Sequence, residues 1–108
     1  MHQIEGNLKL KLLRLAVRAA PNEAVGLILN DRSVVELTNL RTEGNFEVSR
    51  DEVRLALEGE ANIDQVTLWH SHPNGGVGPS RADVQNKSPI PYHLVISLVN
   101  GEIIPTWY

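Results

Sequence analysis

The sequence predicts an α/β fold: a single compact domain over residues 1–108, with a small mixed β-sheet flanked by helices. Three observations support this class. The first segment has helical periodicity, several short apolar runs are bounded by turn residues, and a second and a third helical segment separate those runs. The length of 108 residues allows one hydrophobic core, and 42% apolar with 21% charged residues is typical of a globular protein.

The first elements are a helix and a pair of strands. Residues 6–20 place apolar side chains at helical spacing and stop at Pro21, which predicts an amphipathic helix. The apolar run 24–30 ends at a turn sequence, Asn30-Asp31, and a second run begins at Ser33. This pattern indicates a strand, a turn and a second strand.

The middle of the chain predicts a helix followed by a strand. Ser49 and Glu52 fit a capping box, in which each side chain satisfies the other's backbone N–H, so we expect a helix over residues 50–58 that ends at Gly59. Residues 65–72 then alternate in polarity. A strand here directs four side chains to one face: Val66, Leu68, His70 and His72.

The last third predicts a loop, a short helix and a hairpin. Residues 73–79 contain three glycines, and a helix from Ser80 to about Lys87 is cut off by two prolines. The apolar runs on either side of Asn100-Gly101 predict a β-hairpin, because this dipeptide is preferred in type I′ turns.

Charge and composition exclude several classes of protein. Thirteen acidic and ten basic residues give a net charge of −3, so we expect no nucleic-acid partner and no anionic membrane surface. No apolar stretch is long enough for a membrane span and no signal peptide is evident, so a cytoplasmic location is the default expectation. Because cysteine is absent, any metal must be held by histidine, carboxylate and water.

The segment W-H-S-H-P-N-G-G-V-G-P-S-R-A-D raises the question of a metal site. His70 and His72 lie on one face of a strand at a spacing that lets both rings reach one ion. An isolated H-x-H pair is nevertheless more often structural than metal-binding. His93, on a later predicted strand, is expected to be structural or on the surface, and Trp69 is expected to point into the core.

Ser80 and Asp83 also have two interpretations. Spaced as S-x-x-D after a proline, they fit a helix cap and nothing more. A capped first turn would also hold the Asp83 carboxylate rigidly near the strand end, and two histidines plus one carboxylate would leave the open position typical of catalytic zinc. Spacing alone does not choose a general base among the thirteen carboxylates.

The pattern His70-Ser71-His72-Pro73, six residues, Ser80, two residues, Asp83 resembles the JAMM motif, H-[ST]-H-P-x(6)-S-x-x-D, of the JAB/MPN+ zinc metallopeptidases. It agrees in identity and spacing over fourteen residues. The family also carries an upstream glutamate in an E-x-x-G-L-[IL] context, and Glu23 begins the matching segment E-A-V-G-L-I. The resemblance extends from about Leu8 to Ile103 and implies a cytidine-deaminase-like JAB/MPN fold.

The resemblance implies one zinc per chain, bound by His70, His72 and Asp83. It further implies that Glu23 deprotonates the attacking water and that Ser80 hydrogen-bonds the developing oxyanion. Each role suits the chemistry of its residue.

The implied activity is hydrolysis of a peptide or isopeptide bond in a protein or peptide substrate. Ubiquitin itself is not expected as substrate, because the chain is shorter than most members and Val25 replaces a frequent cysteine. The compact JAB domains of phage tail assembly proteins are the most similar subtype, which suggests tail-protein maturation or trimming of a ubiquitin-like or sulfur-carrier C-terminus, in a bacterial or phage-infected cytoplasm. A catalytically silent MPN-type scaffold or interaction module is the alternative, and the oligomeric state is left open.

Overall fold

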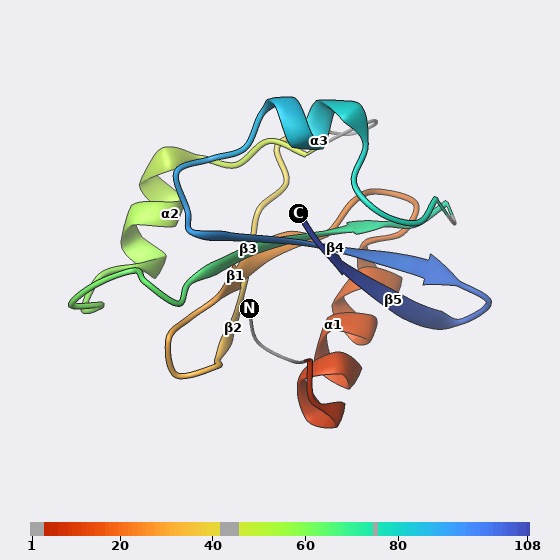
Figure 1. The fold of residues 1–108 in the computed structure, drawn as a ribbon, viewed down its shortest axis with the longest axis horizontal. Coiled ribbons are helices and arrows are strands. Elements are labelled where there is room, and N and C mark those ends of the chain that lie inside the picture. Colours follow the sequence, from red (N-terminus) through yellow and green to blue (C-terminus); the bar gives the residue numbers. More distant parts are fainter. Residues whose placement is uncertain (1–3, 42–45, 75) are drawn as a thin grey trace.

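The computed structural model describes residues 4–41, 46–74 and 76–108, and it confirms an α/β domain with one mixed sheet (Figure 1). The described elements, in chain order, are α1 (Gly6–Ala19), β1 (Val25–Ile28), β2 (Val34–Leu37), α2 (Arg50–Ala56), β3 (Thr67–His72), α3 (Arg81–Gln85), β4 (Tyr92–Val99) and β5 (Glu102–Trp107). Their order agrees with the sequence prediction, and the boundaries differ by at most two residues, as frayed ends commonly do.

The five strands form a sheet in the order β2-β1-β3-β4-β5. β3 and β4 run parallel, with His70 opposite Val95, and the other neighbouring pairs are antiparallel. Parallel neighbours need a crossover connection, and here that connection contains α3. The chain therefore leaves the histidine-bearing end of β3 and passes through α3 before it re-enters the sheet.

Each face of the sheet is covered by a different hydrophobic cluster. Figure 1 shows α1 on one side of the sheet and α2 and α3 on the other. Trp69 lies in the cluster that contains the buried residues of α1, and Leu68 lies in the cluster that packs against α2. Because strand side chains alternate, His70 and His72 share the face of Leu68, away from α1.

Gly26 marks a close approach within the sheet. A Cβ atom at this position would lie 2.1 Å from the carbonyl oxygen of Val35 and 2.7 Å from the ring of Trp69. Only glycine fits between the neighbouring strand β2 and the indole, which explains why the residue stands in the middle of an otherwise apolar strand.

The capping prediction for α2 is half wrong. Ser49 accepts a hydrogen bond from the backbone N–H of Glu52. The Glu52 carboxylate does not reach back to Ser49, because it accepts from the backbone N–H of Thr38 at 2.7 Å and from its hydroxyl at 3.0 Å. A tertiary contact with the segment after β2 therefore replaces the local reciprocal bond, and α2 ends at Ala56.

The hairpin prediction is confirmed. β4 and β5 pair antiparallel, and both turn residues, Asn100 and Gly101, have positive φ values of 52° and 81°. A type I′ turn requires this backbone conformation. Within the described parts of the chain, no helix combines the length and the apolar character needed to cross a membrane.

Candidate metal centre

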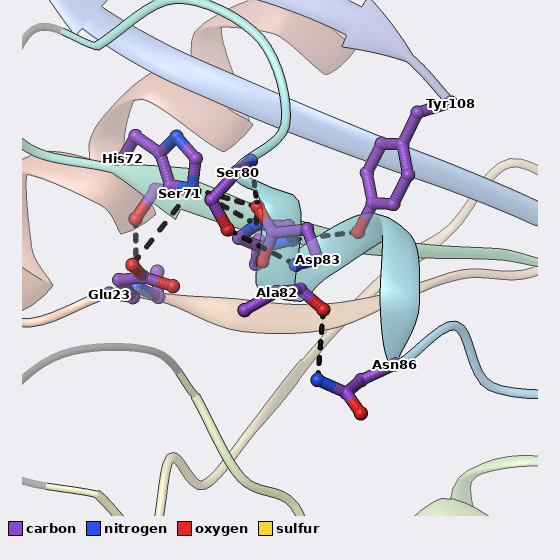
Figure 2. Close-up of polar contacts among 10 residues, drawn as sticks. Glu23, Ser71, His72, Ser80, Ala82, Asp83, Asn86 and Tyr108 are labelled. Carbon is purple, nitrogen blue, oxygen red and sulfur yellow. Dashed lines mark hydrogen bonds and ion pairs between the residues drawn. The ribbon is translucent and has the colours of Figure 1, made fainter.

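His70 and His72 lie at the end of β3, where their ring nitrogens come together. Figure 2 shows the His72 ring close to Glu23 and Asp83. The Nε2 atoms of the two histidines are 3.3 Å apart, and the ring planes are inclined by 65°. The His70 side chain is fully buried, and that of His72 is 15% exposed. The i, i+2 spacing on a strand has therefore brought the two imidazoles together, as the sequence predicts.

Asp83 reaches the same point from α3. Its Oδ2 atom lies 3.0 Å from His70 Nε2 and 3.1 Å from His72 Nε2, and it also accepts from the backbone N–H of Ser80 at 2.9 Å. Ser80 Oγ in turn accepts from the backbone N–H of Asp83 at 3.1 Å, which completes a capping box. The helix cap thus orients the carboxylate toward the histidines.

The three atoms match the donor set and the spacing of a zinc site. Tetrahedral zinc holds N and O ligands at about 2.0–2.1 Å, so its ligand atoms lie about 3.3 Å from one another. The two Nε2 atoms and Asp83 Oδ2 are separated by 3.0 to 3.3 Å. Two imidazole nitrogens at this distance cannot both point N–H groups at each other, but both can direct lone pairs at one cation.

Glu23 lies beside this triangle, between α1 and β1. Its Oε2 atom is 4.0 Å from His72 Nε2, and the side chain is 11% exposed. Glu23, His70 and His72 form a group whose ligand atoms lie within 4.8 Å of one another and could hold a metal ion. The distance from Glu23 to His72 is longer than the distances among His70, His72 and Asp83. Glu23 could therefore either bind a metal or accept a proton beside it.

The Glu23 carboxyl is poorly solvated. Its Oε1 atom is buried and has no hydrogen-bond partner among the described residues. Burial, and secondly the nearby negative charge of Asp83, raise the pKa of Glu23 from 4.5 to about 7. A carboxyl with a pKa near neutrality is suited to accept and release a proton.

The backbone around Glu23 is held from two sides. Asn39 Nδ2 donates to the Glu23 carbonyl at 2.9 Å. Ser71, between the two histidines, accepts from the Ala24 N–H through Oγ at 2.8 Å and donates its own backbone N–H to the Ala24 carbonyl at 2.9 Å. The sequence analysis identified neither Asn39 nor Ser71 as a residue that positions Glu23. Strand alternation does place Ser71 on the face of β3 opposite to that of the two histidines.

The protonation states of Asp83 and His70 suit metal binding. Burial raises the pKa of Asp83, but the hydrogen bond from His70, the Ser80 N–H and the two adjacent imidazoles outweigh it, so the pKa falls well below its usual range. Burial lowers the pKa of His70 more than Asp83 raises it. An ionised carboxylate and a neutral imidazole are the forms that coordinate metals.

Two aromatic rings enclose His70, and the sequence prediction missed both. Phe46 lies against it with ring centroids 4.6 Å apart, and the Tyr108 hydroxyl is 3.5 Å from His70 Nδ1. His93 behaves as expected for a structural histidine, since it is buried and its Nε2 is 3.1 Å from Ser88 Oγ. Trp69 is fully buried in the core, also as expected.

The fold and the donor set together define a class of protein: a compact α/β domain of the JAB/MPN fold, with two strand histidines and a helix-capping aspartate at the crossover between parallel strands. The chain belongs to the family described as prokaryotic homologs of the JAB domain, whose model matches residues 7–107. A comparison with curated protein sequences finds no match.

A solved structure supports the fold assignment. The solution structure of a protein from Salinibacter ruber (strain DSM 13855) is similar to this chain, with a TM-score of 0.56 and 20% sequence identity. The match covers 98% of this chain and 80% of the other. At this identity the similarity concerns the fold.

Proposed function

We propose that this domain is a zinc-dependent metallopeptidase of the JAMM type, which hydrolyses a peptide or isopeptide bond in a protein or peptide substrate. One observation carries the proposal: His70 Nε2, His72 Nε2 and Asp83 Oδ2 converge at 3.0 to 3.3 Å, and beside them lies the Glu23 carboxyl, whose Oε1 atom has no hydrogen-bond partner among the described residues. Family membership supports it, since residues 7–107 match the prokaryotic JAB domain.

In this proposal His70, His72 and Asp83 hold one zinc ion per chain. When bound, zinc polarises a carbonyl group and makes water a nucleophile at neutral pH. Glu23 then accepts the proton of the attacking water and delivers it to the nitrogen of the departing amine. In the metal-free protein, burial and the charge of Asp83 raise the pKa of this carboxyl to about 7, so Glu23 can already take up and release a proton near neutrality before any metal binds.

Ser80 stabilises the developing negative charge on the substrate oxygen. Its oxygen already accepts from the Asp83 N–H at 3.1 Å, and a hydroxyl that accepts one hydrogen bond can still donate its own proton. A donor fixed in advance by the helix cap need not reorganise during the reaction. The capping contact therefore supports a catalytic role and does not compete with it.

The substrate proposals come from the family resemblance: phage tail proteins, and the C-terminal tails of ubiquitin-like or sulfur-carrier proteins. The test is incubation of the zinc-loaded domain with members of each group and mass spectrometry of the products. The Glu23→Gln variant serves as control. Cleavage at one defined bond by the wild type alone supports a peptidase; zinc-loaded protein that binds these partners without cleaving any supports a silent scaffold.

A further inference from the structure

Tyr108 brings a hydroxyl group to the outer side of His70. The residue follows β5, and its backbone N–H donates to the His93 carbonyl at 3.0 Å. Its ring meets His70 edge to face, with centroids 6.0 Å apart and planes inclined by 86°, and the Lys87 ammonium lies 5.6 Å from the ring centre. Figure 2 shows the phenol pointing toward the site, where its hydroxyl is 3.5 Å from His70 Nδ1.

The two nitrogens of His70 face different partners. Nε2 faces Asp83 Oδ2 and His72 Nε2, and Nδ1 faces the Tyr108 hydroxyl. A neutral imidazole carries one proton, so one nitrogen donates while the other accepts. Because the His70 side chain is fully buried, Nδ1 needs a hydrogen-bond partner inside the protein whether it carries a proton or a lone pair.

We propose that Tyr108 is a positioning residue whose hydroxyl pairs with His70 Nδ1 both without and with the metal. Without metal, His70 Nε2–H donates to Asp83, and the Tyr108 O–H donates to the bare Nδ1. With metal, the Nε2 lone pair would serve as the ligand, so the proton would reside on Nδ1 and Tyr108 Oη would accept a hydrogen bond from this N–H. The second half rests on the proposed zinc site.

A hydroxyl suits this position better than other acceptors do. A carbonyl or a carboxylate can only accept, so it would pair with only one of the two tautomers of His70. Burial, together with the negative charges of Asp83 and Glu23, raises the pKa of Tyr108 above its usual value. The phenol therefore keeps its proton throughout the neutral range and can both donate and accept.

The test replaces Tyr108 by phenylalanine, which keeps the ring contacts and removes only the oxygen. Partners that orient a metal-binding histidine typically contribute about 10- to 100-fold in metal affinity, so zinc binding by Tyr108→Phe should weaken by about that factor in a chelator competition. The matched control is Tyr92→Phe on β4, whose ring packs on Trp107 at 6.3 Å. Its zinc affinity should equal that of the wild type, and thermal melting of the metal-free proteins checks folding.

Nitrogen-15 NMR of the histidines tests the metal-free half independently. In Tyr108→Phe the His70 Nδ1 resonance should move toward the position of an unbonded lone pair, and in Tyr92→Phe it should not. Zinc affinity unchanged in Tyr108→Phe would overturn the proposal, and so would an unmoved Nδ1 resonance. Wild-type protein that binds no zinc would contradict the proposed function instead. In that case the Nδ1 resonance of the metal-free protein would still test whether Tyr108 bonds His70.

Discussion

Glu23 is the residue at which structural stability and chemistry conflict. Its carboxyl is nearly buried, one oxygen lacks a partner among the described residues, and Asp83 adds a like charge nearby. Each of these features favours the protonated form, which is the neutral one. A charged Glu23 therefore destabilises the metal-free fold, and a positive ion between the carboxylates would relieve that penalty.

The metal-free protein should lose stability between about pH 4.5 and 7 because of Glu23. The folded-state pKa, about 7, exceeds the ordinary value of 4.5, so the folded state binds the proton more tightly than the unfolded state does. Glu23→Gln removes this loss. Without metal at pH 8 the variant should be more stable than the wild type by about 1–3 kcal/mol.

Urea denaturation of both metal-free proteins at pH 4 and pH 8 measures this difference. At pH 4 the Glu23 carboxyl is largely protonated in both states, so wild type and variant should nearly coincide. The same measurement on Glu47→Gln, an exposed glutamate, provides the control. A wild type that is as stable as Glu23→Gln at pH 8 would contradict the raised pKa.

The same substitution should abolish turnover without removing zinc. Glutamine keeps the shape of glutamate and can still hydrogen-bond water, but it cannot accept a proton. General base catalysis contributes about 10²- to 10⁴-fold, so kcat should fall by at least about 10²-fold while zinc remains at one equivalent. Zinc loss measured by elemental analysis would make Glu23 a ligand, and unchanged kcat would assign the base to another carboxylate.

At the scale of elements, the cap of α3 and the candidate metal centre use the same atoms. Asp83 Oδ2 accepts from the Ser80 N–H and also contacts both histidines. α3 has only five residues, and Asp83 is its one buried side chain. The helix is therefore attached to the sheet largely through the polar groups that would bind the metal.

Substitutions at Ser80 separate capping from catalysis. Aspartate and asparagine both cap helices well, so Ser80→Asp and Ser80→Asn should fold with stability within about 1 kcal/mol of the wild type. Neither keeps the hydroxyl donor, and aspartate adds a negative charge beside the developing oxyanion. We expect no measurable turnover from Ser80→Asp. Full activity in this folded variant would show that Ser80 caps the helix and has no catalytic role.

Gly26→Ala tests the tight packing of β1. The added methyl group would lie 2.1 Å from the Val35 carbonyl oxygen, which belongs to the backbone and cannot rotate away. We expect a loss on the order of 3 kcal/mol in the free energy of unfolding, or failure to fold. Gly6→Ala is the matched control, since nothing lies within 4 Å of its added Cβ; equal stability of the two variants would refute the packing argument.

Local patterns predicted the elements well because each carries its own signal: Pro21 after α1, the alternation of β3, and Asn100-Gly101 in the hairpin. Contacts between elements that are distant in the sequence were not predicted. Glu52 bonds Thr38 and not its own helix start, which no local motif encodes.

The candidate site divides in the same way. The spacing of the histidines, Ser80 and Asp83 allowed both a metal site and a purely structural interpretation. The family motif favoured the metal site, and Glu23 was found only through that motif. Tyr108 was missed because it lies 38 residues from His70 in the sequence. The two residues come together only through the pairing register of β3 with β4 and of β4 with β5.

At the scale of the whole molecule, the two helices on the site face are weakly anchored. α2 contains no fully buried residue, and α3 contains one. α1, by contrast, buries Leu8, Leu12 and Ala16 against the opposite face of the sheet. An ion shared by β3 and α3 would add a link that hydrophobic packing does not supply here.

Zinc should therefore stabilise the whole domain and protect α3 in particular. At a free zinc concentration 100-fold above the dissociation constant, binding adds about 2.7 kcal/mol to the free energy of unfolding. We expect a higher melting temperature, and slower amide hydrogen exchange in residues 81–85, when zinc is added to the metal-free protein. Both effects should be reversed by a chelator.

His72→Ala should abolish the response, because it removes one ligand at the less buried side of the site. The control is His93→Gln, which alters a buried histidine that bonds Ser88 and should keep one equivalent of zinc whatever its stability. Protons compete for the imidazoles, so the stabilisation should fade as the pH drops below about 6. Zinc retained undiminished at pH 4, or by His72→Ala at pH 7, would be incompatible with histidine ligation.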